Sequence, residues 1–194
     1  MNNYKLINNR EQYTTYIPYL NNDISFNETT VEKNENIKLG YSIFDVANWF
    51  LLYKEKMTHE KLQKICYYSE AWHLTLYGEK LFNDTKFKAS ESGPVSPELY
   101  NFFKNEDFKG FVKVNNLINI KDRDIEEKLS EINNDINLVD LLESVWVTYG
   151  DKGPLALEAL SCNELPYKNA NTRKNKTISE KDIKDYYIGI YRRK

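Results

Sequence analysis

The sequence contains few of the residues that build metal, cofactor and nucleophile sites. It has only two histidines, two cysteines and seven glycines among its 194 residues. Neither His59 nor His73 belongs to an HExxH motif, and the chain has no CxxC, P-loop, GxGxxG or GxSxG motif. We therefore expect no metal, no cofactor and no catalytic residue, and we expect that the protein is not an enzyme.

Cys66 and His73 are the two residues that come nearest to a nucleophile and its base. They are seven positions apart on one predicted helix, so their side chains lie about 10 Å apart along its axis, beyond hydrogen-bond reach. We expect Cys66 to be a small apolar core residue and His73 a hydrogen-bonded residue of the core or its boundary. A hydrolase would require a metal or a reactive thiol.

The sequence also lacks long apolar runs and an excess of charge. No apolar run approaches the ~20 residues of a membrane span, and the first residues are polar and rich in asparagine. We expect no membrane segment and no signal peptide, and the scarcity of cysteine fits the reducing cytoplasm. The net charge is −2 and the isoelectric point about 5.8, which argues against a nucleic-acid binder. Basic clusters at 173–176 and 192–194 fit a solvated loop and a frayed end, or a phosphate site.

What the chain does have is a strong helical pattern between residues 59 and 78. Thr58 is placed to cap the helix, Glu60 suits its first turn, and Gly78 suits a left-handed residue after its end. The pattern predicts a helix of about five turns ending at Tyr77. Its apolar face repeats at i, i+3, i+4 and i+7 and consists of Leu62, Ile65, Cys66, Ser69, Trp72, His73 and Leu76.

A turn and a second helix start follow this helix. Residues 87–90 suit a short extended segment, and Gly93-Pro94 must interrupt any helix. We assign Gly93 and Pro94 a structural role in fixing this turn. Ser96 followed by Pro97 and Glu98 predicts the start of the next helix.

The ordered segments LQKICYYSEAWHLTLYG, LF, FKAS and SGPVSPELY resemble the signature of the SocA-like, or Panacea, antitoxin domain. That family also includes phage-associated GepA-type proteins. The resemblance extends over about residues 44–187 and is strongest over 61–100. Ser90 and Ser92 stand where the family usually has tryptophan and tyrosine. Farther on, the family's TH and PW pairs are replaced by Ser161-Cys162 and Pro166-Tyr167.

The rest of the chain predicts further helices and one small β region. We expect a mainly α-helical single domain over residues 39–194, with a small β element at 87–90 and a second one over 111–120. Residues 1–38 predict a variable N-terminal extension, either loosely attached or packed through Tyr13, Tyr16, Ile17, Tyr19 and Leu20. The other predicted helices begin at Ser42, at about residue 124, at Asn137 as cap, at Gly153-Pro154 and at Ser179.

Aromatic residues are abundant: fifteen tyrosines, nine phenylalanines and three tryptophans. Not all of them fit the buried stripes, and tyrosine is common at protein–protein hot spots, although ordinary boundary packing explains such residues equally well. This abundance favours a binding protein over an enzyme. We predict partner contacts around the central helix and the turn, at Tyr67, Tyr68, Trp72, Glu91, Ser92, Val95 and Tyr100.

The resemblance implies an antitoxin that binds a cognate protein toxin and neutralises it. In one branch of the family the domain is an adaptor that delivers the toxin to an ATP-dependent protease. The alternatives are a DNA-binding transcriptional regulator and a phage-encoded accessory protein. The acidic isoelectric point and the lack of a basic recognition helix make DNA an unlikely partner.

Overall fold

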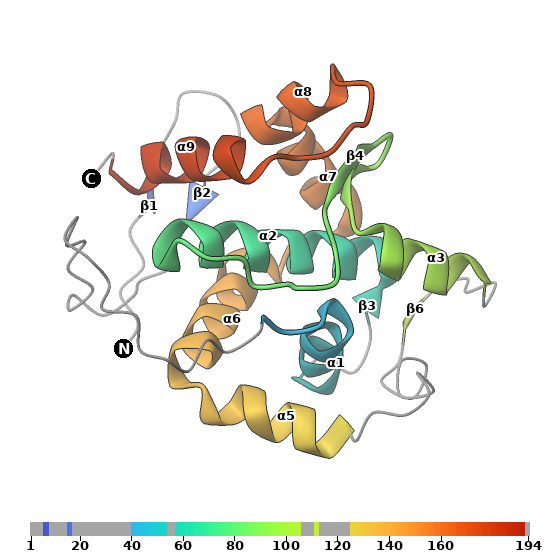
Figure 1. Ribbon diagram of the computed structural model, residues 1–194, viewed down its shortest axis with the longest axis vertical. Helices are drawn as coiled ribbons and strands as arrows, with labels where there is room; N and C mark the ends of the chain where they lie inside the picture. The colour runs from blue at the N-terminus through green and yellow to red at the C-terminus, as the bar shows by residue number, and fades with distance from the viewer. Residues whose placement is uncertain are drawn as a thin grey trace.

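Helix α2 (His59–Tyr77) lies at the centre of the fold, with the other elements arranged around it. In the computed structural model, the described residues are 40–53, 57–105 and 125–192, together with short strands at 6–7, 15–16 and 111–112. In Figure 1, α2 crosses the middle of the molecule, with α8 and α9 on one side and α1, α5 and α6 on the other. The remaining helices are α1 (Ile43–Tyr53), α3 (Pro97–Asn105), α5 (Ile125–Asn134), α6 (Ile136–Tyr149), α7 (Pro154–Asn163), α8 (Leu165–Asn171) and α9 (Glu180–Tyr191).

The ends of α2 confirm the predicted caps. The Thr58 hydroxyl accepts a hydrogen bond from the Lys61 amide at 3.3 Å. Gly78 has a φ of 78°, in the left-handed region, and its amide donates to the Leu74 carbonyl at 3.1 Å. Every residue from Leu62 to Leu76 except His73 is buried, because α6, α7, α9 and a β-hairpin all pack against α2.

That hairpin pairs β4 (Lys88–Ser90) with β5 (Gly93–Val95) in antiparallel register, with Ser90 opposite Gly93. It confirms the predicted β element at 87–90. Helix α3 follows directly, and the Ser96 hydroxyl accepts from the Leu99 amide at 3.2 Å, as the predicted helix start requires. Gln63 of α2 holds Ser96 in place, since its side chain accepts from the Ser96 amide at 2.8 Å and donates to the Ser96 carbonyl at 3.3 Å.

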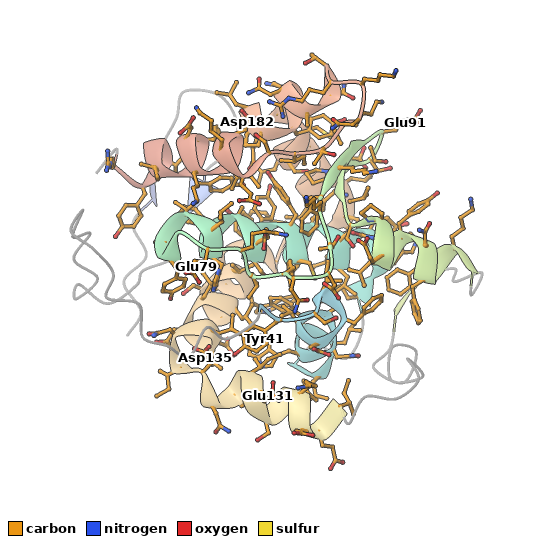
Figure 2. The ribbon with its side chains drawn as sticks, viewed as in Figure 1. Tyr41, Glu79, Glu91, Glu131, Asp135 and Asp182 are labelled. Carbon is orange, nitrogen blue, oxygen red and sulfur yellow. The ribbon has the colours of Figure 1, made fainter. Side chains whose placement is uncertain are left out.

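Two other helix starts depend on residues distant in sequence. Ser42 lies at the start of α1 as predicted, but Asp84 completes the cap: its carboxylate accepts from the Ile43 amide at 3.0 Å and from the Ser42 hydroxyl at 2.5 Å. Helix α6 is capped by Asp135 rather than by Asn137, so that prediction was wrong by two residues. Asp135 accepts from the Leu138 amide at 3.1 Å and also from the Tyr41 hydroxyl at 3.0 Å, and Figure 2 shows the latter pair side by side.

Helices α7 and α9 pack directly against α2, and α8 packs on both of them. Helix α7 begins at Pro154 as predicted and runs past residue 160 to Asn163. Helix α8, which begins one residue before Pro166, was not predicted from the sequence. The Ser179 hydroxyl accepts from the Asp182 amide at 3.1 Å and confirms the predicted start of α9.

Three further short strands are described. β6 (Phe111–Val112) pairs with β3 (Met57–Thr58), which confirms a strand at the start of the predicted 111–120 region, while 117–120 lie outside the described residues. β1 (Leu6–Ile7) pairs with β2 (Thr15–Tyr16). The rest of 1–38 lies outside the described residues, so the boundary at residue 38 stays a prediction. None of the described helices is both long and apolar enough to cross a bilayer.

Candidate functional site

The seven residues predicted to contact a partner fall into two groups. Tyr67, Tyr68 and Trp72 are buried with 0% of their surface exposed. Glu91 and Ser92 are exposed, Val95 is half-buried, and Tyr100 is 48% exposed. Only the second group is available to a partner in this fold.

The buried aromatic residues belong to the core because α2 has no solvated face over most of its length. The Tyr68 ring stacks on Tyr149 of α6 at 3.8 Å between centroids. The Trp72 indole donates to the Tyr149 hydroxyl at 3.1 Å, and its ring meets Tyr187 of α9 edge to face at 5.0 Å. We therefore assign Tyr67, Tyr68 and Trp72 to packing and exclude them from the partner surface proposed below.

The exposed group forms what we call the hairpin–α3 surface, defined as Glu91, Ser92, Val95 and Tyr100. Glu91 and Ser92 form the turn between β4 and β5, and Figure 2 shows Glu91 directed away from the body of the protein. Val95 ends β5, and Tyr100 lies in the first turns of α3. Four side chains of different chemistry therefore lie along one continuous segment of ten residues.

The hairpin is fixed along the open edge of β4. The Ala89 amide donates to the Lys176 carbonyl at 2.8 Å, and the Ile178 amide donates to the Phe87 carbonyl at 2.9 Å. The Tyr167 hydroxyl of α8 donates to the Ser90 carbonyl at 2.8 Å. These bonds hold the hairpin to the segment between α8 and α9, so its turn projects from a well-ordered base.

Gly93 brings the hairpin onto a group of side chains that we call the Lys64 cluster, consisting of Lys64, Ser161, Cys162 and Tyr167. A Cβ atom at Gly93 would lie 2.9 Å from Lys64 Cε, 2.9 Å from Ser161 Oγ and 3.4 Å from Cys162 Sγ. The φ of Gly93 is 92°, which L-residues rarely adopt. This position therefore requires glycine twice, for its backbone conformation and for its contacts.

The Lys64 cluster and Gly93 bring together residues from three segments on which the family resemblance is based: the central helix, the hairpin and residues 161–167. Ser161-Cys162 and Tyr167, which replace parts of the family's TH and PW pairs, meet the Gly93 turn here. Burial lowers the pKa of Lys64 to about 8, despite the opposing effect of nearby Cys162 and Glu158. Burial raises the pKa of Cys162, while Tyr167 and Lys64 act in the opposite direction.

A second buried cluster surrounds Glu164, between α7 and α8, and was missed in the sequence. Its carboxylate accepts from the Tyr187 hydroxyl at 2.7 Å and from the Tyr68 hydroxyl at 3.2 Å. Tyr67 lies beside them, and its buried hydroxyl has no hydrogen-bond partner of normal geometry. Burial raises the pKa of Glu164 to about 8, because desolvation outweighs the tyrosine hydrogen bonds. No local motif marks such a residue, since its partners come from α2 and α9.

Cys66 and His73, considered above as a nucleophile and its base, both have the surroundings of residues that stabilise the fold. Cys66 is fully buried, and burial raises the pKa of its thiol. His73 Nδ1 lies 2.9 Å from the Glu79 carbonyl oxygen, as expected for a boundary histidine. In the part of the chain that the structure describes, no three His, Cys, Asp or Glu side chains are grouped to hold a metal ion.

Comparison with known protein families shows which family the central part of the chain matches. The family model described as "Antitoxin SocA-like, Panacea domain" matches residues 62–168, which is more than half of the chain. The matched region begins in the first turn of α2 and ends within α8, so it includes the hairpin–α3 surface, the Lys64 cluster and Glu164, but not Tyr187 of α9. No curated protein and no solved structure matches the chain.

Proposed function

Because the chain belongs to the antitoxin SocA-like family with its Panacea domain, we propose that it neutralises a cognate protein toxin by binding it directly. The observation that carries this proposal is the position of the hairpin–α3 surface inside the matched region. Its four side chains are at least partly exposed, and its base is held by backbone and side-chain hydrogen bonds. A binding surface on an ordered base loses little conformational entropy when a partner docks.

The chemistry of the surface indicates what the toxin would present. Tyr100 offers a large, half-exposed ring at low rotamer cost, which suits insertion into an apolar pocket. Glu91 offers a carboxylate at the projecting turn, which suits a lysine or arginine of the toxin. Val95 and Ser92 lie between them. We propose that binding here occludes the functional site of the toxin.

We also propose that the chain works by binding and not by catalysis, in the cytoplasm and without a cofactor. This is supported by the structural surroundings of Cys66 and His73 described above. Delivery of the bound toxin to an ATP-dependent protease is a further possibility within the same proposal. It predicts that the antitoxin shortens the half-life of the toxin in cells, and that deleting the protease restores that half-life while the complex still forms.

Substitutions in the hairpin–α3 surface are expected to weaken neutralisation. Co-expression of the chain with the product of its neighbouring reading frame should rescue growth, and the two proteins should co-purify. Tyr100→Ala combined with Glu91→Lys should raise the dissociation constant for that product by roughly 100-fold, because hot-spot side chains each contribute about 1–2 kcal/mol or more. Growth rescue should then be lost at equal expression.

Ile136→Ala provides the matched control for this experiment. Ile136 is 74% exposed and adjoins Asp135, which Figure 2 shows far from Glu91. It should leave both rescue and affinity unchanged. Equal rescue by the double variant and the wild type would refute the proposed surface. If the neighbouring product does not bind but the chain shifts its upstream DNA at physiological salt, the regulator interpretation replaces the antitoxin.

Removal of residues 1–38 tests the proposed role of the N-terminal extension. We expect the shortened chain to remain folded, because the described core is built from residues after this segment. Its affinity for the toxin is expected to change, since the segment carries four tyrosines and a phenylalanine and lacks the pattern of a core element. A titration that gives the same affinity with and without the segment would remove this hypothesis.

A further inference from the structure

Lys64 is an almost fully buried lysine, and Cys162, Glu158 and Glu60 are close enough to favour its charged form. Only 2% of its surface is exposed, and it makes no hydrogen bond or ion pair with another described residue. Burying a lysine that has no direct hydrogen-bond or ion-pair partner costs stability, and a hydrophobic residue of the same length would avoid that cost. The position of its amine therefore calls for a chemical explanation.

The nearest reactive group is the thiol of Cys162. Lys64 Cε and Cys162 Sγ lie 2.9 and 3.4 Å from one common point, the place of a Cβ at Gly93, so the two atoms are no farther apart than the sum of these distances. The lysine amine extends one bond beyond Cε on a flexible stem. Cys162 is half-buried, whereas Cys66 is fully buried, so Cys162 is the thiol that we expect hydrogen peroxide to reach.

We propose that Lys64 and Cys162 form an oxidation-sensitive pair, in which peroxide drives a reversible sulfenamide cross-link between α2 and α7. In the first step the Cys162 thiolate attacks one peroxide oxygen, the O–O bond breaks, and the departing hydroxide takes a proton to become water. Sulfur is oxidised by two electrons to a sulfenic acid, and peroxide is reduced. In the second step the neutral Lys64 amine attacks this sulfur. An S–N bond forms, the S–O bond breaks, and the hydroxyl group leaves as water with a proton from nitrogen.

The surroundings of Lys64 and Cys162 favour the attack of the amine on sulfur more than the oxidation of the thiol. A lysine whose pKa is about 8 is neutral in about one molecule in ten at pH 7, compared with less than about one in a thousand for an ordinary lysine. The raised pKa of Cys162 keeps most of the thiol protonated and makes the first step slow at neutral pH. Cross-linking is therefore expected to accelerate between pH 7 and pH 9, as both groups lose their protons.

The test treats the full chain with hydrogen peroxide and measures the intact mass and the linked peptides. The expected product is lighter than the untreated chain by two hydrogen atoms, joins the peptides that contain Lys64 and Cys162, and reverts with dithiothreitol. Cys66→Ala should form the same product, because its thiol is not involved. Cys162→Ser should form none, and Lys64→Met should gain oxygen at Cys162 instead of losing hydrogen.

Two results would overturn the proposal. One is a wild-type chain that gains oxygen at Cys162 as Lys64→Met does, with no linked peptide. The other is a Cys162 that stays unmodified at pH 9 while an exposed reference thiol in the same solution is oxidised. Both are read on the wild-type protein, so they do not depend on the folding of a variant. The proposal is independent of toxin binding.

Discussion

Replacing Gly93 with alanine is expected to lower the free energy of unfolding by about 2–5 kcal/mol. The backbone of Gly93 has a φ of 92°, and the added methyl group would lie 2.9 Å from both Lys64 Cε and Ser161 Oγ. The Lys64 stem can yield a little, whereas Ser161 is fully buried on α7. Strain and overpacking therefore add, and denaturant unfolding at constant pH measures their sum.

Substitutions at two other glycines separate the cost of backbone strain from the cost of overpacking. Gly78 has a φ of 78° with nothing within 4 Å of an added Cβ, so Gly78→Ala tests the backbone strain alone and should cost about 1 kcal/mol. Gly189 lies inside α9 and is also open, so Gly189→Ala should be neutral or stabilise the helix by up to about 1 kcal/mol. If Gly93→Ala costs no more than Gly78→Ala, the hairpin does not rest on the Lys64 cluster.

The folded protein is expected to lose stability as the pH rises from about 5 to 8. Glu164 and Glu70 are buried carboxyl groups whose pKa values rise from 4.5 to about 8 and about 7. Between these values the unfolded chain has released protons that the folded chain retains, so the unfolding free energy falls with pH. The loss is about 1.4 kcal/mol per unit of pKa shift for each group, several kcal/mol in total, and is complete above about pH 8.

Above about pH 8, Lys64 makes the unfolding free energy rise with pH instead of fall. Its pKa falls from 10.5 to about 8 on folding, so between these values the folded chain has released a proton that the unfolded chain still holds. Stability then rises with pH until about 9, where Cys66 and Cys162, whose pKa values burial raises from 9.0, begin to act in the opposite direction. The unfolding free energy should accordingly pass through a minimum near pH 8.

Two variants test which residues cause the fall of the unfolding free energy below pH 8 and its rise above pH 8. Glu164→Gln should reduce the fall between pH 5 and pH 8, and the remaining slope combines the fall from Glu70 with an opposing rise below pH 6.5 from His73, whose pKa burial lowers. Lys64→Met should remove the rise above pH 8. An unfolding free energy that increases from pH 5 to pH 8 in the wild type would show that the Glu164 carboxyl is not shielded from solvent as described.

The sequence predicts those features of the fold whose causes lie within a few residues. The caps at Thr58, Ser96 and Ser179 and the left-handed Gly78 each depend on a neighbour three or four positions away, and all four are confirmed. Residues that act across long sequence separations were missed. Asp84 caps α1 from 41 positions away, and Tyr68 reaches Glu164 across 96.

The candidate site was predictable only in part, for a related reason. A helical repeat of apolar residues assumes one solvated face, and on that assumption Tyr67 and Tyr68 lie outside the buried stripe. Helix α2 is instead enclosed by α6, α7, α9 and the hairpin, so both faces are core. Glu91, Ser92, Val95 and Tyr100 are at least partly exposed, because Glu91 and Ser92 form the turn between β4 and β5 and Tyr100 lies near the start of the helix that Pro97 initiates. Their contact with a partner stays a prediction.

The most direct test of this account is a titration of the purified chain with the purified product of the neighbouring reading frame. The account predicts a saturable complex of fixed stoichiometry, in which Glu91 and Tyr100 become protected from solvent while Ile136 stays exposed. Absence of a complex, or a complex that protects Ile136 and leaves Tyr100 exposed, would contradict it.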